Sequence, residues 1–267
     1  MSVTGSSVLF CNGQPADAAT LGAALVNYGH FTSLQVRGHA VQGLDLHLQR
    51  LAHATQALFG SMLDERQVQR WMAQALQHAG MADASLRVTV FSRAFDFRDP
   101  LSVVPVDVLV AVSAPVRLSA SRAVCSVRYQ RELPGFKHVG TFGLFQQRRE
   151  AMAAGFDDAL FLNEEGQVSE GSTWNLALHD GQQLVWPQAA ALRGTAEALL
   201  RQHWNGPQVV RAVAAAELDG IQAAFACNAS GIWPLGAIDG RALAGSEALA
   251  AQGRAVMAAV PWQALQV

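Results

Sequence analysis

The amino-acid sequence predicts an α+β protein of two domains, a small N-terminal domain of sheet and helix and a larger, β-rich C-terminal domain. Two amphipathic helical patterns lie among strand patterns in the first 116 residues. A stretch with few large apolar residues, Ala114 to Arg122, then interrupts the chain. Short strand patterns separated by turns dominate the rest. We therefore expect domains at residues 1–116 and 122–267.

The first domain opens with a strand, Val8 to Cys11, and a tight turn at Asn12-Gly13. Residues 14–25 show no clear pattern. The further expected elements are a strand at 31–36, a turn at 37–38, a helix from 45 to Gly60, a helix from Asp64 to Gly80, and strands at 86–90 and 106–112. Apolar residues at three-to-four spacing predict the helices, and alternation predicts the strands. Asp64 is a typical N-cap, and the two glycines are typical helix stops.

The second domain alternates short strands with three helical segments. The expected elements are a strand at 124–129, a helix ending at Gly155, a strand at 159–162, a turn at 163–166, strands near 168 and 176–178, a helix at 195–203, a strand at 223–227, turns at 228–231 and 239–240, and a helix at 246–259. No internal repeat is present.

Composition excludes several classes of protein. With 51% hydrophobic residues in 267, the chain can bury a large core. A net charge of −2, without a basic run, argues against binding to nucleic acid or to anionic membranes. Three cysteines, Cys11, Cys125 and Cys227, lack the spacing of a disulfide framework or a zinc site, so we expect no metal. No targeting or membrane-spanning segment is recognisable, so we expect a cytoplasmic protein.

The chain contains a single lysine. Of the 19 basic residues only Lys137 is a lysine. An arginine guanidinium stays protonated, whereas a desolvated lysine amine can attack a carbonyl carbon, so Lys137 is a candidate Schiff-base residue. The alternative is that codon bias left one lysine by chance.

Five segments decide between these interpretations: FTSLQVRGHAVQGLDLHLQRL, LPGFKHVG, VSEGSTWN, ALRGTAEALL and FACNASGIWPL. Their order resembles the class IV aminotransferases, pyridoxal 5'-phosphate enzymes of fold type IV that include branched-chain and D-amino-acid aminotransferases and aminodeoxychorismate lyases. The resemblance spans nearly the whole chain. It implies that the cofactor lies in the cleft between the two domains and that the protein is a homodimer.

The resemblance also assigns roles to residues that contact the cofactor ring. It implies that Lys137 forms the Schiff base with the cofactor and then carries a proton during the reaction. Glu170 matches the carboxylate that holds the pyridine nitrogen protonated; alone, it would be a solvent-facing strand-end residue. Asn175 matches an asparagine that supports this neighbourhood, although it could equally stabilise a turn.

Three groups match the phosphate site. Arg50 matches the arginine that grips the phosphate; otherwise it is an exposed helix arginine. Thr195 and Ala196 open a helix, where free N–H groups favour an anion. Asn228 and Ala229 match a second phosphate turn.

The sequence departs from the family around this phosphate site and after the lysine. The usual L-P-G-[IV]-T-R has Arg193 for Pro, Ala196 for Thr and Glu197 for Arg. These changes leave the backbone N–H donors in place, but Ala196 removes the hydroxyl of the family threonine. Phe142 replaces a tyrosine of the branched-chain enzymes, which favours the lyase branch.

A further group of residues are candidates for contact with the substrate. Tyr28, His30 and Thr32 match a region of the small domain that reaches over the active site. Arg131 could bind a substrate carboxylate or form a surface ion pair near Glu132. His138 is either a packing residue, which we favour, or part of the substrate site.

The expected function is transfer of an amino group between an amino acid and a 2-oxo acid through Lys137. The enzymatic alternative is elimination of pyruvate from 4-amino-4-deoxychorismate, which needs the same cofactor, lysine and glutamate. The other alternative is a non-catalytic protein that binds pyridoxal phosphate. The retained lysine argues against it.

Overall fold

The computed structural model describes residues 8–116 and 120–266. It confirms the predicted α+β class, and the chain packs as two compact units. Of the described residues, the small unit takes 8–116, 136–140 and 261–266, and the large unit takes 120–135 and 141–260. The expected boundary stays a prediction, and residues 117–119 within it lie outside the described part of the chain, as does the N-terminal segment 1–7.

The small unit is built on an antiparallel sheet in the order β2-β1-β6-β5-β3. Its strands are β1 (Val8–Cys11), β2 (Gln14–Pro15), β3 (His30–Val36), β5 (Ala84–Phe91) and β6 (Asp107–Ser113). The turn between β1 and β2 has positive φ at Asn12 (49°) and Gly13 (79°), which confirms the predicted tight turn. A separate pair, β4 (Ala40–Gln42) with β16 (Trp262–Ala264), joins the end of the chain to this unit, and sequence patterns did not predict β16.

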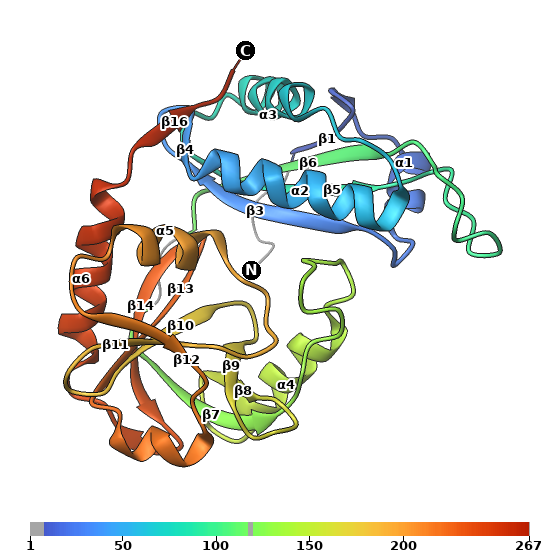
Figure 1. Ribbon diagram of the computed structural model, residues 1–267. Helices are drawn as coiled ribbons and strands as arrows, with labels where there is room; N and C mark the ends of the chain where they lie inside the picture. Colours follow the sequence, from blue (N-terminus) through green and yellow to red (C-terminus); the bar gives the residue numbers. More distant parts are fainter. Residues whose placement is uncertain (1–7, 117–119, 267) are drawn as a thin grey trace. The chain divides into compact units, whose positions relative to one another are not determined.

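Two helices cover one face of this sheet (Figure 1). They are α2 (Leu44–Phe59), which ends at Gly60, and α3 (Glu65–Ala79), which Asp64 caps through the N–H of Gln67 and which ends at Gly80. Both glycines have left-handed backbones, so the predicted stops are confirmed. A short helix, α1 (Ala18–Ala24), occupies part of the stretch that showed no pattern.

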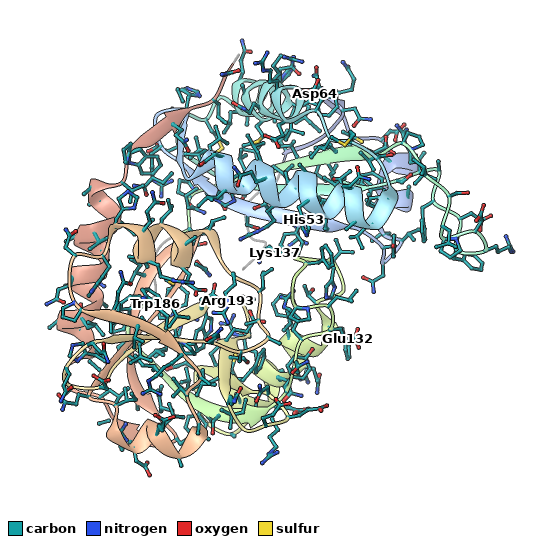
Figure 2. All side chains as sticks on the ribbon, in the orientation of Figure 1. His53, Asp64, Glu132, Lys137, Trp186 and Arg193 are labelled. Carbon is teal, nitrogen blue, oxygen red and sulfur yellow. The ribbon has the colours of Figure 1, made fainter. Side chains whose placement is uncertain are left out.

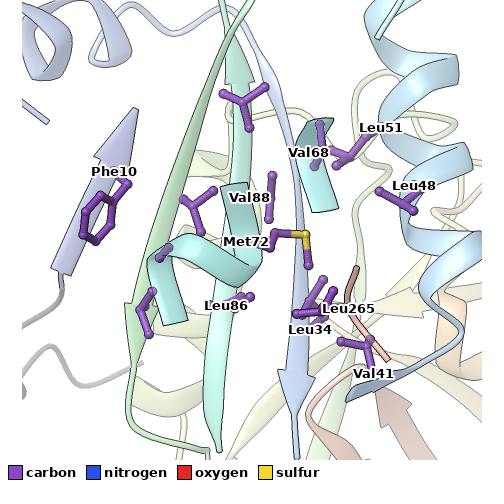
Figure 3. Packing of buried hydrophobic residues seen from close by; sticks show 14 of the residues in the cluster. Phe10, Leu34, Val41, Leu48, Leu51, Val68, Met72, Leu86, Val88 and Leu265 are labelled. Atoms are coloured by element: carbon purple, nitrogen blue, oxygen red, sulfur yellow. The ribbon is translucent and has the colours of Figure 1, made fainter. Parts of the chain in front are cut away.

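The core of the small unit lies between the sheet and these helices (Figure 3). Leu34 on β3 and Leu86 and Val88 on β5 face Leu48 of α2 and Met72 of α3 in one buried cluster. Every second strand residue points to this side, as the alternation predicted. The opposite face carries Arg87 and Phe31, which return in the description of the site.

Polar side chains also cross this interface. The Thr32 hydroxyl lies 2.7 Å from Nδ1 of His47, and Nε2 of His30 lies 3.1 Å from the Thr55 hydroxyl. All four residues are buried. Burial lowers the pKa of His30 to about 4, and burial, then the charges of Arg50 and Lys137, lower the pKa of His47 to about 3.

The large unit is built on a mixed sheet in the order β12-β11-β10-β13-β14-β7-β8-β9, with β15 beside β14. The strands are β7 (Arg122–Arg128), β8 (Asp158–Leu162), β9 (Val168–Gly171), β10 (Asn175–His179), β11 (Leu184–Pro187), β12 (Gln208–Arg211), β13 (Ala223–Asn228), β14 (Gly231–Ile238) and β15 (Arg241–Ala242). The helices are α4 (Phe142–Ala153), α5 (Thr195–His203), the 3₁₀ turn η1 (Ala215–Gly220) and α6 (Ser246–Ala259). The predicted strands and helices of this region are confirmed.

A buried carboxylate ties several of these elements together. Asp158, at the start of β8, is fully buried and accepts a hydrogen bond from Nε1 of Trp174 at 3.0 Å. Its other partners are Arg122 on β7 at 3.2 Å and Arg148 on α4 at 3.6 Å. Because two arginines neutralise it, the charge can remain inside the protein. In the described residues of both units, no helix combines the length and the apolar character needed to span a membrane.

The buried histidines predict how stability changes in acid. In the unfolded chain both imidazoles protonate near pH 6.5, but in the folded protein they stay neutral to about pH 4 and pH 3. Their contribution is therefore complete above pH 6.5 and is lost as the pH falls below it. At pH 5 the expected loss is about 2 kcal/mol for each histidine.

The test is urea unfolding at pH 7 and pH 5. His47→Asn should lose less stability between these two pH values than the wild type does, whatever its absolute stability. The control is His39→Asn, because His39 is exposed and asparagine tolerates its left-handed backbone (φ 60°). An equal pH-dependent loss in the wild type and in His47→Asn would contradict the argument.

Candidate functional site

The segment that carries Lys137 is bound to the outer edge of β3. The N–H of Phe31 donates to the Lys137 carbonyl at 2.9 Å, and the N–H of Val139 donates to the Gly29 carbonyl at 2.9 Å. Residues 136–140 thus add a short strand-like segment to the small sheet, and they belong to the small unit although their neighbours on both sides belong to the large unit. These bonds fix the position of the lysine backbone on the sheet edge.

Aromatic contacts anchor the same segment. The Phe136 ring stacks on His53 of α2, with centroids 5.7 Å apart and planes within 8°. Figure 2 labels His53 and Lys137 in this part of the small unit. His138 pairs with His30 as an isolated antiparallel bridge. A Cβ at Gly140 would lie 3.0 Å from Nδ1 of His138, so the imidazole packs closely on the backbone of its own loop. These contacts favour the packing role for His138.

Two cations lie at one aromatic ring. Nζ of Lys137 is 4.9 Å from the centroid of the Phe31 ring, and the guanidinium carbon of Arg87 is 3.5 Å from the same centroid. Burial lowers the pKa of Arg87. Within the described residues no carboxylate pairs with Arg87. A desolvated guanidinium without such a partner is ready to receive a carboxylate ligand.

Sequence reasoning did not identify Arg87. The available signal was a charged residue, second in the strand pattern Leu86 to Val90. Whether its charge is solvated depends on which face of the sheet its side chain points to. That direction depends on which face of the sheet the helices cover, and the strand pattern alone does not contain this information.

Arg50 lies on α2, close to this part of the small unit. It is half-buried and stands three residues after His47, so the two share a face of the helix. The charges of Arg50 and Lys137 both lower the pKa of His47, which places both cations within electrostatic reach of one imidazole.

The three small-unit residues expected at the substrate face inward. The Tyr28 hydroxyl donates to the Leu58 carbonyl at 3.2 Å, and its ring stacks on Phe95 at 4.2 Å. His30 and Thr32 are 1% and 0% exposed and make the hydrogen bonds to α2 described above. Contact of these three side chains with a substrate stays a prediction; their observed contacts hold the small unit together.

In the large unit, Glu170 forms the centre of the second group. It lies on β9, is 5% exposed, and its Oε1 accepts from the Leu192 N–H at 3.3 Å. Nε of Arg131 is 3.4 Å from the same oxygen. Arg131 is 5% exposed, so the alternative of a surface ion pair near Glu132 is wrong. Arg131 instead neutralises a buried carboxylate, as does the pair of arginines at Asp158.

Asn175 connects this carboxylate to the start of α5. Its Nδ2 donates to the Leu192 carbonyl at 2.8 Å, so Leu192 is bound by Glu170 and Asn175 together. A Cβ at Gly194 would lie 2.2 Å from Oδ1 of Asn175, and glycine is therefore needed there for space. Gly194 is the N-cap of α5, whose first residue is Thr195.

The first turn of α5 keeps its backbone donors although its side chains depart from the family pattern. Thr195 and Ala196 are both buried. Glu197, also buried, pairs with Arg193 at 3.1 Å and with Arg201 at 3.7 Å, so its negative charge is offset.

The expected second phosphate turn is a tight hairpin. Oδ1 of Asn228 accepts from the Ser230 N–H at 2.8 Å, which stabilises the turn around Ala229 between β13 and β14. Nδ2 of Asn228 donates to the Thr173 carbonyl at 3.1 Å and so binds the hairpin to the loop after β9.

Comparison with known proteins identifies this arrangement. The family described as Amino-transferase class IV matches residues 29–238. The branched-chain aminotransferase of the thermophilic archaeon Thermoproteus uzoniensis, with norvaline, superposes with a TM-score of 0.81 at 20% identity, over 95% of this chain and 96% of that one. A hypothetical aminotransferase from Mycobacterium tuberculosis in a PLP-bound form gives 0.77 at 22%, over 95% and 98%.

A third similar structure carries a different name. The putative 4-amino-4-deoxychorismate lyase of Legionella pneumophila gives a TM-score of 0.77 at 18% identity, over 89% of this chain and 93% of that one. A search of curated proteins finds no significant match. At these identities the structures establish the fold alone, whereas the family match covers most of the sequence. The chain belongs to the class IV aminotransferase family.

Proposed function

We propose that this protein is a pyridoxal phosphate-dependent aminotransferase that moves an amino group between an amino acid and a 2-oxo acid. The observation that carries the proposal is the placement of the only lysine. Lys137 lies within the matched residues 29–238, its backbone is fixed on the edge of β3, and the Arg87 guanidinium lies at the same aromatic ring. An amine held beside a carboxylate-binding group suits chemistry on amino acids.

The residues present fit the cofactor. A basic ring nitrogen needs a buried carboxylate, and Glu170 is one. A phosphate needs backbone donors at a helix start, and the glycine at position 194 lets α5 begin tightly against Asn175. When bound, pyridoxal phosphate supplies an aldehyde that condenses with primary amines and a ring that accepts electrons.

Each residue then has one task. Lys137 would hold the cofactor through its amine, and the same amine would carry the proton from the Cα of the substrate amino acid. Glu170 would contact the protonated ring nitrogen, and Arg131, whose Nε lies 3.4 Å from Oε1, would orient this carboxylate. Asn175 fixes the Leu192 backbone that Glu170 also contacts.

The phosphate ligands we propose are one side chain and two pairs of backbone groups. They are Arg50, the N–H groups of Thr195 and Ala196, and the turn of Asn228 and Ala229.

Arg87 is the residue we propose for the carboxylate of the substrate. Amino acids and 2-oxo acids share this group, and a half-buried arginine binds it through paired N–H donors. Tyr28, His30 and Thr32 are proposed to support this region from the core side. A homodimer is the assembly that we expect.

Elimination of pyruvate from 4-amino-4-deoxychorismate is the second candidate. The similarity to the Legionella pneumophila lyase supports it, as does Phe142 in place of a tyrosine. That substrate also carries carboxylates, so Arg87 does not separate the two reactions.

Borohydride reduction tests the lysine. The purified protein with pyridoxal phosphate should show a visible absorption band, and reduction should link the cofactor to the tryptic peptide from Glu132 to Arg148. Lys137→Arg should keep the charge yet lose both band and adduct, because a guanidinium does not condense with the aldehyde. The N-terminal amine is the only other primary amine. An adduct there, or none while the cofactor is bound, would contradict the assignment.

A substrate panel separates the two reactions. The protein is mixed with pairs of amino acids and 2-oxo acids and, separately, with aminodeoxychorismate. Exchange of amino groups without release of p-aminobenzoate is the expected result. Release of p-aminobenzoate without exchange would establish the lyase instead.

Replacement of Arg87 tests substrate recognition. Arg87→Gln should raise KM for amino and 2-oxo acids about ten- to a hundredfold, because a charge-assisted contact is worth about 1.5 to 3 kcal/mol. Affinity for pyridoxal phosphate should not change. Arg66→Gln makes the same change at an exposed position of α3 and should have no effect. An unchanged KM in Arg87→Gln would leave its contact with Phe31 as a structural one.

A further inference from the structure

One residue of α4 is a glycine, and the side chain of a tyrosine outside this helix explains why. Gly143, the second residue of the helix, does not have a positive φ, so its backbone does not require glycine. A Cβ there would lie 2.3 Å from the Tyr129 hydroxyl and 3.0 Å from Cζ. Because glycine weakens a helix relative to alanine, its presence is explained by the space that the tyrosine needs.

The tyrosine ring is held firmly at this position. Tyr129 directly follows β7, and its N–H donates to the Leu162 carbonyl of β8 at 3.0 Å. Its ring packs on Phe161 with centroids 4.8 Å apart, in the cluster that includes Leu144 of α4. The direction of the hydroxyl is therefore set by the β7–α4–β8 unit visible in Figure 1.

The hydroxyl itself makes no hydrogen bond within the described residues, and the side chain is only partly buried. Tyr129 stands two residues before Arg131, and the nearby charges are those of Arg131, Glu132 and Glu170. Burial raises its pKa; Arg131 opposes the rise, and the two glutamates add to it. The phenol is thus a neutral donor near the buried pair of Arg131 and Glu170.

We propose that the Tyr129 hydroxyl donates a hydrogen bond to the ring oxygen of bound pyridoxal phosphate, and that Gly143 exists to admit it. This rests on the proposed function. The ring oxygen is bonded to a carbon of the same pyridine ring whose nitrogen is assigned to Glu170, and it carries negative charge when that nitrogen is protonated. An anionic oxygen close to a carboxylate needs a neutral or cationic donor, and Tyr129 is a donor with no competing partner among the described residues.

Absorption spectroscopy and cofactor binding test the proposal. Tyr129→Phe should shift the visible band of the lysine-bound cofactor and weaken the affinity for pyridoxal phosphate about ten- to a hundredfold. The control is Ser102→Ala, which likewise removes a single hydroxyl, from an exposed position of the small unit where that hydroxyl bonds Asp99. It should move neither the band nor the affinity.

A second variant reaches the same hydroxyl from the helix. Gly143→Ala should reproduce the shift seen in Tyr129→Phe, because the new Cβ displaces the hydroxyl. In the Tyr129→Phe background the alanine should add little, as expected for two changes that act on one contact. Circular dichroism and thermal unfolding identify variants that fail to fold, and Tyr129→Phe, which removes a single oxygen, is then decisive.

The outcomes distinguish the two proposals. If the wild-type protein shows no band and no lysine adduct, the proposed function fails. If the band is present but Tyr129→Phe has the wild-type spectrum and affinity, or if Ser102→Ala shifts them equally, the assignment of Tyr129 is overturned and the proposed function stands.

Discussion

Two backbone hydrogen bonds on the outer edge of β3 determine where the only lysine of this protein can act. An edge strand presents unpaired N–H and C=O groups that invite another segment, and here residues 136–140 occupy that edge. Backbone bonds do not depend on side-chain identity, so two hydrogen bonds fix the position of the lysine backbone. The alternate residues of the same strand, His30 and Thr32, bind α2, so one strand positions both the helix that carries Arg50 and the segment that carries Lys137.

The large unit places its charges by a different principle. Glu170 and Asp158 are both carboxylates inside the protein, and each is neutralised by arginine. At Asp158 two arginines and an indole N–H surround the carboxylate, which suits a structural role. At Glu170 one arginine and one backbone N–H approach the same oxygen, Oε1. Both contacts direct positive charge or partial charge at this oxygen, which suits the proposed contact of Glu170 with a protonated ring nitrogen.

Local signals predicted most of the elements, and non-local packing accounts for what they missed. The ends of α2 and α3 were predictable because Gly60, Asp64 and Gly80 act within one helical turn. The pairing of β16 with β4 joins residues more than 200 positions apart, and no local pattern reports it. The burial of Arg131 and the position of Arg87 against Phe31 could not be predicted for the same reason. In both cases the sequence shows a charged residue, and the partner of that charge depends on elements distant in the chain.

The departures at α5 show how a phosphate-binding turn could survive a change of its side chains. A carboxylate in the first turn of a helix is favourable for the helix dipole, yet it repels an anion bound at the same end. Glu197 avoids this conflict because Arg193 and Arg201, four residues away on either side, offset its charge. The N–H groups of Thr195 and Ala196 belong to the backbone, and their geometry is set by Gly194 and Asn175 instead of by the residue at position 197. The proposed anion site at the start of α5 therefore rests on backbone donors, and the ion pairs of Glu197 with Arg193, just before the helix, and with Arg201 offset the carboxylate that replaces a family arginine.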